Sequence, residues 1–285
     1  MRVISDFDGV LTAQEGEAEA VGDRQIELLT ESIGSKTVAR TLIEEYRLEV
    51  RSAPARHGWW VKGYLTCYAD EDPYVFHTAV ASVLYDKGPR SVVDKLIATG
   101  MEDANAFAGR CFTEGTAAWR SQNGSHLVPE SVELFKALSE LGAEVVVVSN
   151  STTDRIESIL EDFGRDRFDG ALPTVRGGAR KFVVTDDIEV PVDEVATFGP
   201  RTVALRRGHY YKILAEERPV LVIGDVLSLD LALPVTLRDT QPGFEGLKVC
   251  FRRAAHTPAW AVGAAQARGI HIVDSLMQLP AILAG

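Results

Sequence analysis

The sequence predicts an α/β protein with a doubly wound, Rossmann-like, mainly parallel sheet as its core and an inserted α-helical domain. Two observations predict the core: its apolar runs lack the polar alternation of strands that face water, and helical patterns separate one run from the next. The third observation is a long stretch of mainly helical pattern, 13–127, between the first run and the second. The 285 residues, 46% of them hydrophobic, are ample for such a core.

Short apolar runs bounded by turn or polar residues are predicted to be the strands of the sheet. AEVVVVSN (143–150) and PVLVIGD (219–225) show no polar alternation, which is typical of strands covered by helices on both faces. The predicted strands are 3–5, 144–149, 220–224, 248–251 and 270–273.

Helices are predicted between these strands. Pro129 begins a segment with apolar residues at helical spacing, and Gly142 follows it, as is typical of helix termini. Two further helices are expected over 154–163 and 209–219. Because ligands of doubly wound folds bind at the carboxyl ends of the strands, functional residues are expected there.

The stretch 13–127 is too long for an ordinary crossover and is interpreted as an inserted helical domain, which leaves 1–12 and 128–285 as the core. Residues 11–17 and 121–129 are expected to link the two domains, and the Gly, Asn and Ser of the second linker suit a hinge. The helices expected in the insertion are 18–33, 37–50, 74–85, 91–98 and 103–120.

Two segments allow more than one interpretation. Residues 177–205 contain two β-type runs, 180–186 and 201–205, which indicate a hairpin or a loop that leaves the sheet. Residues 56–77 are rich in aromatic and basic side chains that could hold a substrate, although packing inside the inserted domain is the favoured interpretation of Trp59, Trp60 and Tyr64.

Composition narrows the range of partners and locations. With 30 basic and 41 acidic residues the net charge is -11, which disfavours nucleic acid and anionic membranes as partners. No apolar run reaches the length of about 18 residues that a membrane span needs, and the N-terminus lacks the features of a secretory signal. The odd, widely spaced Cys67, Cys111 and Cys250 suit reduced thiols. A cytoplasmic protein that acts on a small molecule is therefore expected, either as a monomer or as a homodimer.

Polar residues follow three of the predicted strands. Asp6 and Asp8 follow the first; residues two apart in an extended chain share a face, and two such carboxylates repel unless a cation lies between them. A hard divalent ion with oxygen ligands resolves this conflict, and Mg²⁺ is the usual one in phosphate chemistry. Asp225 and Asp230 follow the strand at 220–224.

The strand at 144–149 ends in Ser149, which Asn150 follows, and Lys212 lies near the start of the helix at 209–219. Taken singly, these residues have ordinary interpretations: Ser149 with Asn150 as a helix cap, Lys212 as a solvated charge, and Asp225 as a turn residue. Taken together, with their order along one α/β pattern, they indicate a catalytic site.

These segments resemble the motifs of the haloacid dehalogenase superfamily. DFDGVLT (6–12) looks like its first motif, VVSNS (147–151) its second, Lys212 its third and GDVLSLD (224–230) its fourth. The resemblance covers the core, and the insertion after the first motif matches the position of a helical cap. It implies a magnesium-dependent phosphatase that acts on a small-molecule phosphomonoester.

The resemblance also implies a role for each residue. Asp6 would be the nucleophile and a metal ligand. Asp8 would be the general acid and base, and its main-chain carbonyl would bind the metal together with Asp225. Ser149, with Asn150, would bind the phosphoryl group. The remaining roles fall to Lys212, which would neutralise charge, and to Asp230, which would orient the lysine or a metal-bound water.

Three alternatives stay open at this stage. Lys181 is a second candidate for the active-site lysine, although its place in the expected hairpin favours Lys212. A sugar phosphomutase would use the same aspartyl-phosphate and the same acid, and a catalytically silent member would bind phosphorylated ligands as a regulator. Dehalogenation is set aside, because the family's dehalogenases need no acid at the position of Asp8.

Overall fold

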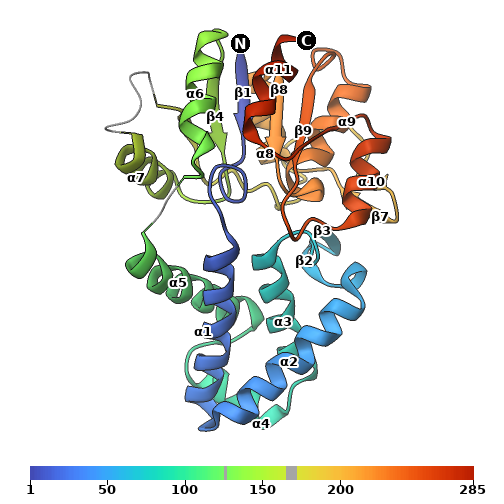
Figure 1. Ribbon diagram of the computed structural model, residues 1–285. Coiled ribbons are helices and arrows are strands. Elements are labelled where there is room, and N and C mark those ends of the chain that lie inside the picture. The colour runs from blue at the N-terminus through green and yellow to red at the C-terminus, as the bar shows by residue number, and fades with distance from the viewer. Residues whose placement is uncertain (125–126, 165–171) are drawn as a thin grey trace. The chain divides into compact units, whose positions relative to one another are not determined.

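The computed structural model of the chain describes residues 1–124, 127–164 and 172–285 (Figure 1). These residues form two compact units, and each is described by itself. The first unit comprises Met1–Ala13, Trp60–Thr66 and His126–Gly285, and the second comprises Gln14–Trp59 and Cys67–Ser125.

The first unit contains a six-stranded sheet in which all neighbouring strands are parallel. Its order is β10-β9-β8-β1-β4-β5, so the first strand of the chain lies at the centre. The strands are β1 (Arg2–Ser5), β4 (Glu144–Val148), β5 (Thr174–Arg176), β8 (Leu221–Gly224), β9 (Lys248–Arg252) and β10 (His271–Val273). The doubly wound, Rossmann-like architecture predicted from the sequence is confirmed.

Both faces of the central strands are covered. Successive residues of a strand point to opposite faces, yet Val3 and Ile4 of β1 are both buried, as are Val146 and Val147 of β4. This explains the missing polar alternation in the sequence. The helices of this unit are α6 (Glu130–Glu140), α7 (Thr153–Gly164), α8 (Gly208–Glu217), α9 (Ala232–Thr240), α10 (Ala259–Ala267) and α11 (Leu279–Ala284).

Two sequence-based expectations about the strands need correction. The run 180–186 is not a strand; the hairpin of this region pairs β6 (Val195–Phe198) with β7 (Arg201–Ala204) in antiparallel register. The prediction also missed β5, which has three residues and therefore too short an apolar pattern to detect.

The second unit is mainly helical. Each of its helices was expected, with ends that differ by a few residues, and Asp72 and Asp103 cap two of them by accepting bonds from main-chain N–H groups. Leu28, Ile43 and Phe107 are buried in its hydrophobic core. The helices are α1 (Glu15–Ile33), α2 (Lys36–Ser52), α3 (Pro73–Lys87), α4 (Arg90–Ala98) and α5 (Ala104–Asn123).

The sequence prediction missed a second hairpin, in the aromatic segment. Its strands are β2 (Gly58–Val61) and β3 (Tyr64–Tyr68), and the turn places Lys62 and Gly63 at φ values of 50° and 81°, as a tight hairpin turn requires. Trp60 is 60% exposed, so packing is the wrong interpretation for this side chain.

Some expectations about the insertion stay predictions. The division of the chain at 13–127, and a cap function for that segment, are not tested. In the second expected linker, residues 125 and 126 lie outside the described residues. None of the described helices is long and apolar enough to cross a membrane.

Candidate active site

Asp6 and Asp225 directly follow two neighbouring parallel strands of the sheet. β1 and β8 are parallel neighbours with Ser5 opposite Ile223, and Asp6 extends this pairing by donating its N–H to the Ile223 carbonyl at 3.0 Å. Asp225 follows β8 directly. The register of the sheet therefore brings Asp6 and Asp225 to the same edge, as expected from their positions after predicted strands.

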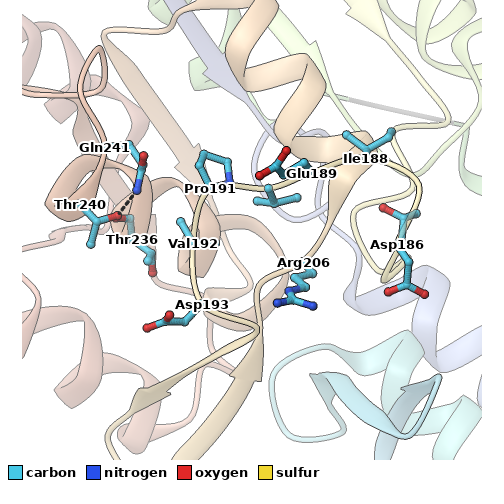
Figure 2. Close-up of a pocket in the computed structure, with 12 residues that line it drawn as sticks. Asp186, Ile188, Glu189, Pro191, Val192, Asp193, Arg206, Thr236, Thr240 and Gln241 are labelled. Atoms are coloured by element: carbon cyan, nitrogen blue, oxygen red, sulfur yellow. Dashed lines mark hydrogen bonds between the residues drawn. The ribbon is translucent and has the colours of Figure 1, made fainter.

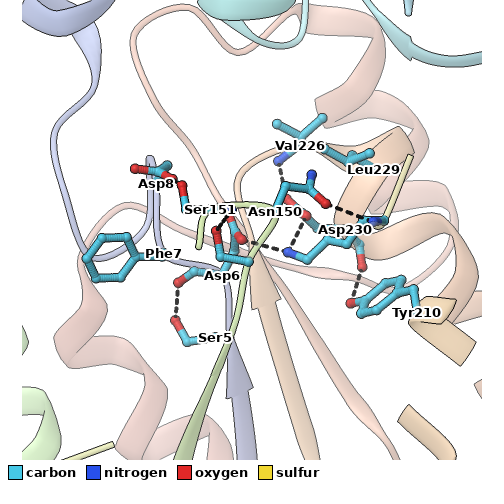
Figure 3. Close-up of polar contacts among 12 residues, drawn as sticks. Ser5, Asp6, Phe7, Asp8, Asn150, Ser151, Tyr210, Val226, Leu229 and Asp230 are labelled. Carbon is cyan, nitrogen blue, oxygen red and sulfur yellow. Dashed lines mark hydrogen bonds and ion pairs between the residues drawn. The ribbon is translucent and has the colours of Figure 1, made fainter. Parts of the chain in front are cut away.

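A third acid completes this group. Carboxylate oxygens of Asp6, Asp225 and Asp230 lie within 4.8 Å of one another, and all three residues are buried. Asp230 lies in a single π-helical turn, Leu227–Leu231, where its side chain accepts a bond from the Val226 N–H at 3.1 Å (Figure 3). These three residues are called the acid group below.

Lys181 lies inside the acid group. Its Nζ donates to Asp6 Oδ1 at 2.6 Å and to Asp230 Oδ1 at 2.8 Å, and its side chain is 2% exposed. The main-chain N–H of Lys181 donates to Asn150 Oδ1 at 2.8 Å, so Asn150 fixes the segment that carries the lysine. Tyr210 lies beneath the ammonium group, 5.6 Å from Nζ to the ring centroid, and donates its hydroxyl to the Asp230 carbonyl.

Lys212, the lysine that the sequence favoured, does not join the acid group. Its side chain is 66% exposed and forms an ion pair at 3.9 Å with Glu216, one helical turn further along α8. The cause is helical geometry: Tyr210 and Leu214 are buried on one face, and a residue midway between them points to the opposite side. The preference for Lys212 over Lys181 is therefore corrected by the structure.

Burial and the neighbouring charges have opposite effects on the pKa values of Asp6 and Lys181. Burial raises the pKa of Asp6 to about 7, although the Lys181 ammonium opposes the increase. For Lys181, burial lowers the pKa, but the negative charges of Asp230 and Asp6 outweigh it, so the pKa lies above its ordinary value. The lysine therefore stays charged.

The acid group fits a magnesium ion. Three carboxylates converge, and the ammonium group that contacts two of them supplies one positive charge. Mg²⁺ binds oxygen ligands and would balance the remaining negative charge of a buried site. The Asp8 side chain is not among the three converging carboxylates.

Asp8 instead binds the segment after β4. Its Oδ2 accepts a bond from Ser151 Oγ at 2.7 Å, and Arg155 on α7 forms an ion pair with Asp8 at 2.9 Å (Figure 3 shows Asp8 and Ser151). Ser149 is buried, and its Oγ accepts from the Ser151 N–H at 3.1 Å. Sequence reasoning missed Ser151 and Arg155, although Ser151 ends the segment VVSNS that was selected.

Gly224 allows Asp225 and Asp230 to lie close together. A Cβ atom at Gly224 would lie 2.3 Å from the Asp230 Cβ and 2.7 Å from its Oδ2. Any side chain at this position would displace the acid, so the glycine of GDVLSLD is a steric requirement.

A cavity of about 710 Å³ lies in the same unit but contains no member of the acid group (Figure 2). The segment 185–193 and the end of α9 form its wall, with Arg206 and the acids Asp186, Glu189 and Asp193 among the lining residues. Gln241 donates to Thr240 at 3.3 Å on one side of it.

Residues 1–182 of the chain match the family model of the haloacid dehalogenase-like hydrolases. No significant match was found among curated protein sequences. Among solved structures, the chain is similar to a haloacid dehalogenase-like family hydrolase from Xanthomonas campestris, with 15% identity and a TM-score of 0.47 over 100% of this chain and 90% of the other.

Two further structures are about as similar. A protein predicted to be a phosphoglycolate phosphatase from Haemophilus somnus has 16% identity and a TM-score of 0.44 over 98% of this chain and 96% of its own. CbbY from Rhodobacter sphaeroides, in complex with phosphate, has 15% identity and a TM-score of 0.45 over 98% and 95%. Sequence identities and TM-scores as low as these do not establish an activity for this chain.

Proposed function

Since this chain belongs to the haloacid dehalogenase-like hydrolases, we propose that it is a magnesium-dependent phosphatase that hydrolyses a small-molecule phosphomonoester through an aspartyl-phosphate on Asp6. The observation that carries the proposal is the acid group with its lysine. Asp6 lies 2.6 Å from the buried Lys181 ammonium and shares a site with Asp225 and Asp230. A carboxylate nucleophile, a fixed cation and ligands for a divalent ion are the parts that phosphoryl transfer requires.

In the first step, a carboxylate oxygen of Asp6 forms a bond to phosphorus while the bond from phosphorus to the ester oxygen breaks. Asp8 gives its proton to the departing alkoxide, which leaves as an alcohol. Lys181 stays charged beside the Asp6 carboxylate and lowers the repulsion between that anion and the phosphate.

In the second step, water attacks phosphorus and Asp8 takes its proton. The bond from phosphorus to the Asp6 oxygen breaks, which releases inorganic phosphate and restores the carboxylate. Asp6 and Asp225 would hold Mg²⁺, with Asp230 close to them, and the ion would neutralise phosphoryl charge. Ser149, with Asn150, would bind the phosphoryl group, and Asn150 also holds the Lys181 main chain.

The experiment is hydrolysis of p-nitrophenyl phosphate by the purified chain with magnesium, with Asp6→Asn as the comparison. We expect release of inorganic phosphate that requires magnesium and is lost in Asp6→Asn. No turnover over a broad panel of phosphomonoesters would overturn the proposal and favour a silent phosphate-binding protein.

The acidic composition and the buried thiols of Cys67, Cys111 and Cys250 support a cytoplasmic location for this enzyme.

A further inference from the structure

The two peptide groups that flank Asp230 are each held by a buried side chain. The carbonyl of Leu229, which precedes Asp230, accepts a bond from Arg207 Nη1 at 3.0 Å. The carbonyl of Asp230 itself accepts a bond from the Tyr210 hydroxyl at 2.9 Å (Figure 3). Rotation about either backbone bond of Asp230 would break one of these contacts, so the direction in which its side chain leaves the backbone is fixed.

The turn that carries Asp230 is unusual. Residues Leu227–Leu231 form a π-helical turn, which is rare in proteins and frequent at functional sites. Inside this segment the Asp230 N–H donates to the Val226 carbonyl at 2.8 Å, and the Val226 N–H donates back to Asp230 Oδ2 at 3.1 Å. These two bonds fix Asp230 within the turn, whereas the contacts from Arg207 and Tyr210 fix the turn relative to its neighbours.

Arg207 also binds a third segment of the first unit. It lies directly before α8 and is fully buried, and its Nη2 donates to the Thr66 carbonyl at 2.7 Å. Burial of a charged group is unfavourable unless it is hydrogen-bonded, and a planar guanidinium can donate to acceptors in separate segments at once. Arg207 therefore joins Thr66 and the start of α8 to the turn of Asp230.

The position of Asp230 controls the position of the lysine charge. Asp230 Oδ1 accepts a bond from Lys181 Nζ at 2.8 Å, and the same nitrogen donates to Asp6 Oδ1 at 2.6 Å. A displacement of Asp230 would therefore turn the ammonium group away from the nucleophile. Because a misplacement of about 1 Å in a catalytic group can lower a rate by about 100-fold, the bonds that hold Asp230 matter to the reaction.

We propose that Arg207 and Tyr210 are positioning residues of the active site, which hold Asp230 against Lys181 and so direct the lysine at Asp6. Both act through Asp230 and not on the substrate. The inference rests on the proposed phosphatase function and goes beyond it, since neither residue belongs to the sequence segments that indicated the site.

The test is steady-state hydrolysis of p-nitrophenyl phosphate with magnesium. Arg207→Met and Tyr210→Phe should each lower kcat by at least about fivefold and change KM by less than about threefold, because Asp230 does not hold the substrate. Tyr210→Phe removes only the hydroxyl and keeps the ring, which lies beneath the Lys181 ammonium group at 5.6 Å. This variant therefore tests the inference even if Arg207→Met does not fold.

Two matched controls remove the same kinds of bond elsewhere. Arg238 donates to the carbonyls of Arg268 and Gly269, which precede β10, and Tyr85 donates its hydroxyl to the Met101 carbonyl in the helical unit. Arg238→Met and Tyr85→Phe should change kcat by less than about twofold. If the site variants lose no more activity than these controls, the inference is overturned.

A spectroscopic signal of the lysine gives a readout that does not depend on turnover. The Lys181 ammonium group is buried and bonded to two carboxylates, so its protons should exchange slowly enough to appear in proton–nitrogen correlation spectra, where Lys181→Met identifies the signal by its loss. Arg207→Met and Tyr210→Phe should shift or broaden this signal, and Arg238→Met should leave it unchanged. An unchanged signal in the folded site variants, or no such signal in the wild type, would contradict the inference.

The two proposals fail in different ways. If the wild type hydrolyses phosphomonoesters and the Arg207 and Tyr210 variants keep its kcat, only the positioning role is wrong. If the wild type hydrolyses none, the proposed function is wrong, and the ammonium signal alone decides whether the two residues hold the lysine in place.

Discussion

Lys181 Nζ lies 2.6 Å from Asp6 Oδ1, although 175 positions separate the two residues in the chain. Lys181 is 2% exposed and also contacts Asp230, so its charge is directed at the acid group and not at solvent. The loop between β5 and β6 carries it there, held at its start by Asn150. This arrangement makes Lys181 the cation of the proposed site.

The first prediction compares the two lysines. Lys181→Met should lower kcat for p-nitrophenyl phosphate by about 100-fold or more, because it removes a fixed positive charge from a buried centre. Lys212→Met removes a solvated lysine of α8 and should change kcat by less than about twofold. Steady-state kinetics of both variants check this, with circular dichroism to show that each is folded. A larger loss in Lys212→Met than in Lys181→Met would contradict the assignment.

The second prediction concerns magnesium as a ligand of the folded state. Because an ion that binds only the folded chain stabilises it, magnesium at about 100 times its dissociation constant should add about 2.7 kcal/mol to the free energy of unfolding. Asp225→Asn should lose this gain together with the magnesium-dependent activity. Asp193→Asn, which changes an exposed acid of the separate cavity, should keep both.

Thermal unfolding with and without magnesium measures the effect, and chelation by EDTA should reverse it. If Asp225→Asn responds to magnesium as strongly as the wild type does, the ion binds elsewhere and the acid group is not its site.

Much of the fold followed from the sequence because the strands and helices have different apolar periods. The strands at 144–149 and 220–224 and the helix after Pro129 were placed correctly, and with them Asp6 and Asp225 at one edge of the sheet. Parallel strands leave little freedom here, since a residue that directly follows a strand must lie at its carboxyl end.

The lysine could not be placed in the same way. Residues 180–186 look like a strand because Phe182, Val183 and Val184 are adjacent, but Asn150 holds this segment as a loop through a side-chain contact that no periodic pattern encodes. The pairing of Asp8 with Arg155 was missed for a similar reason. The contact between Asp8 and Arg155 depends on the direction of α7 relative to β4. Tertiary packing sets this direction, and the local sequence pattern does not encode it.

The third prediction tests the steric role of Gly224. Gly224→Ala places a methyl group 2.3 Å from the Asp230 Cβ, so Asp230 must move away from Lys181. We expect a loss of about 1–3 kcal/mol in the free energy of unfolding, typical of overpacking, and a strong loss of activity. Urea unfolding and kinetics measure the two effects.

Gly263→Ala is the matched control for this substitution. Gly263 lies inside α10, and a Cβ there would meet nothing within 4 Å. Alanine should therefore stabilise the chain by about 0.5–1 kcal/mol through its higher helix propensity. Equal stability changes in both variants would show that the close approach to Asp230 is unimportant.

The last prediction concerns His77 in the helical unit. Burial, reinforced by the charge of Arg47, lowers the pKa of His77 from 6.5 to about 3, and the ring contacts the Gln25 side chain at 3.2 Å. Below pH 6.5 the unfolded chain therefore binds a proton that the folded chain does not, and the free energy of unfolding falls as the pH decreases towards 3. The expected slope from this residue is about 1.4 kcal/mol per pH unit.

His77→Gln removes the titrating group, so urea unfolding between about pH 6 and about pH 4 should show a shallower loss of stability in the variant than in the wild type. Parallel curves for the two proteins would mean that His77 binds a proton equally well in the folded and unfolded chains.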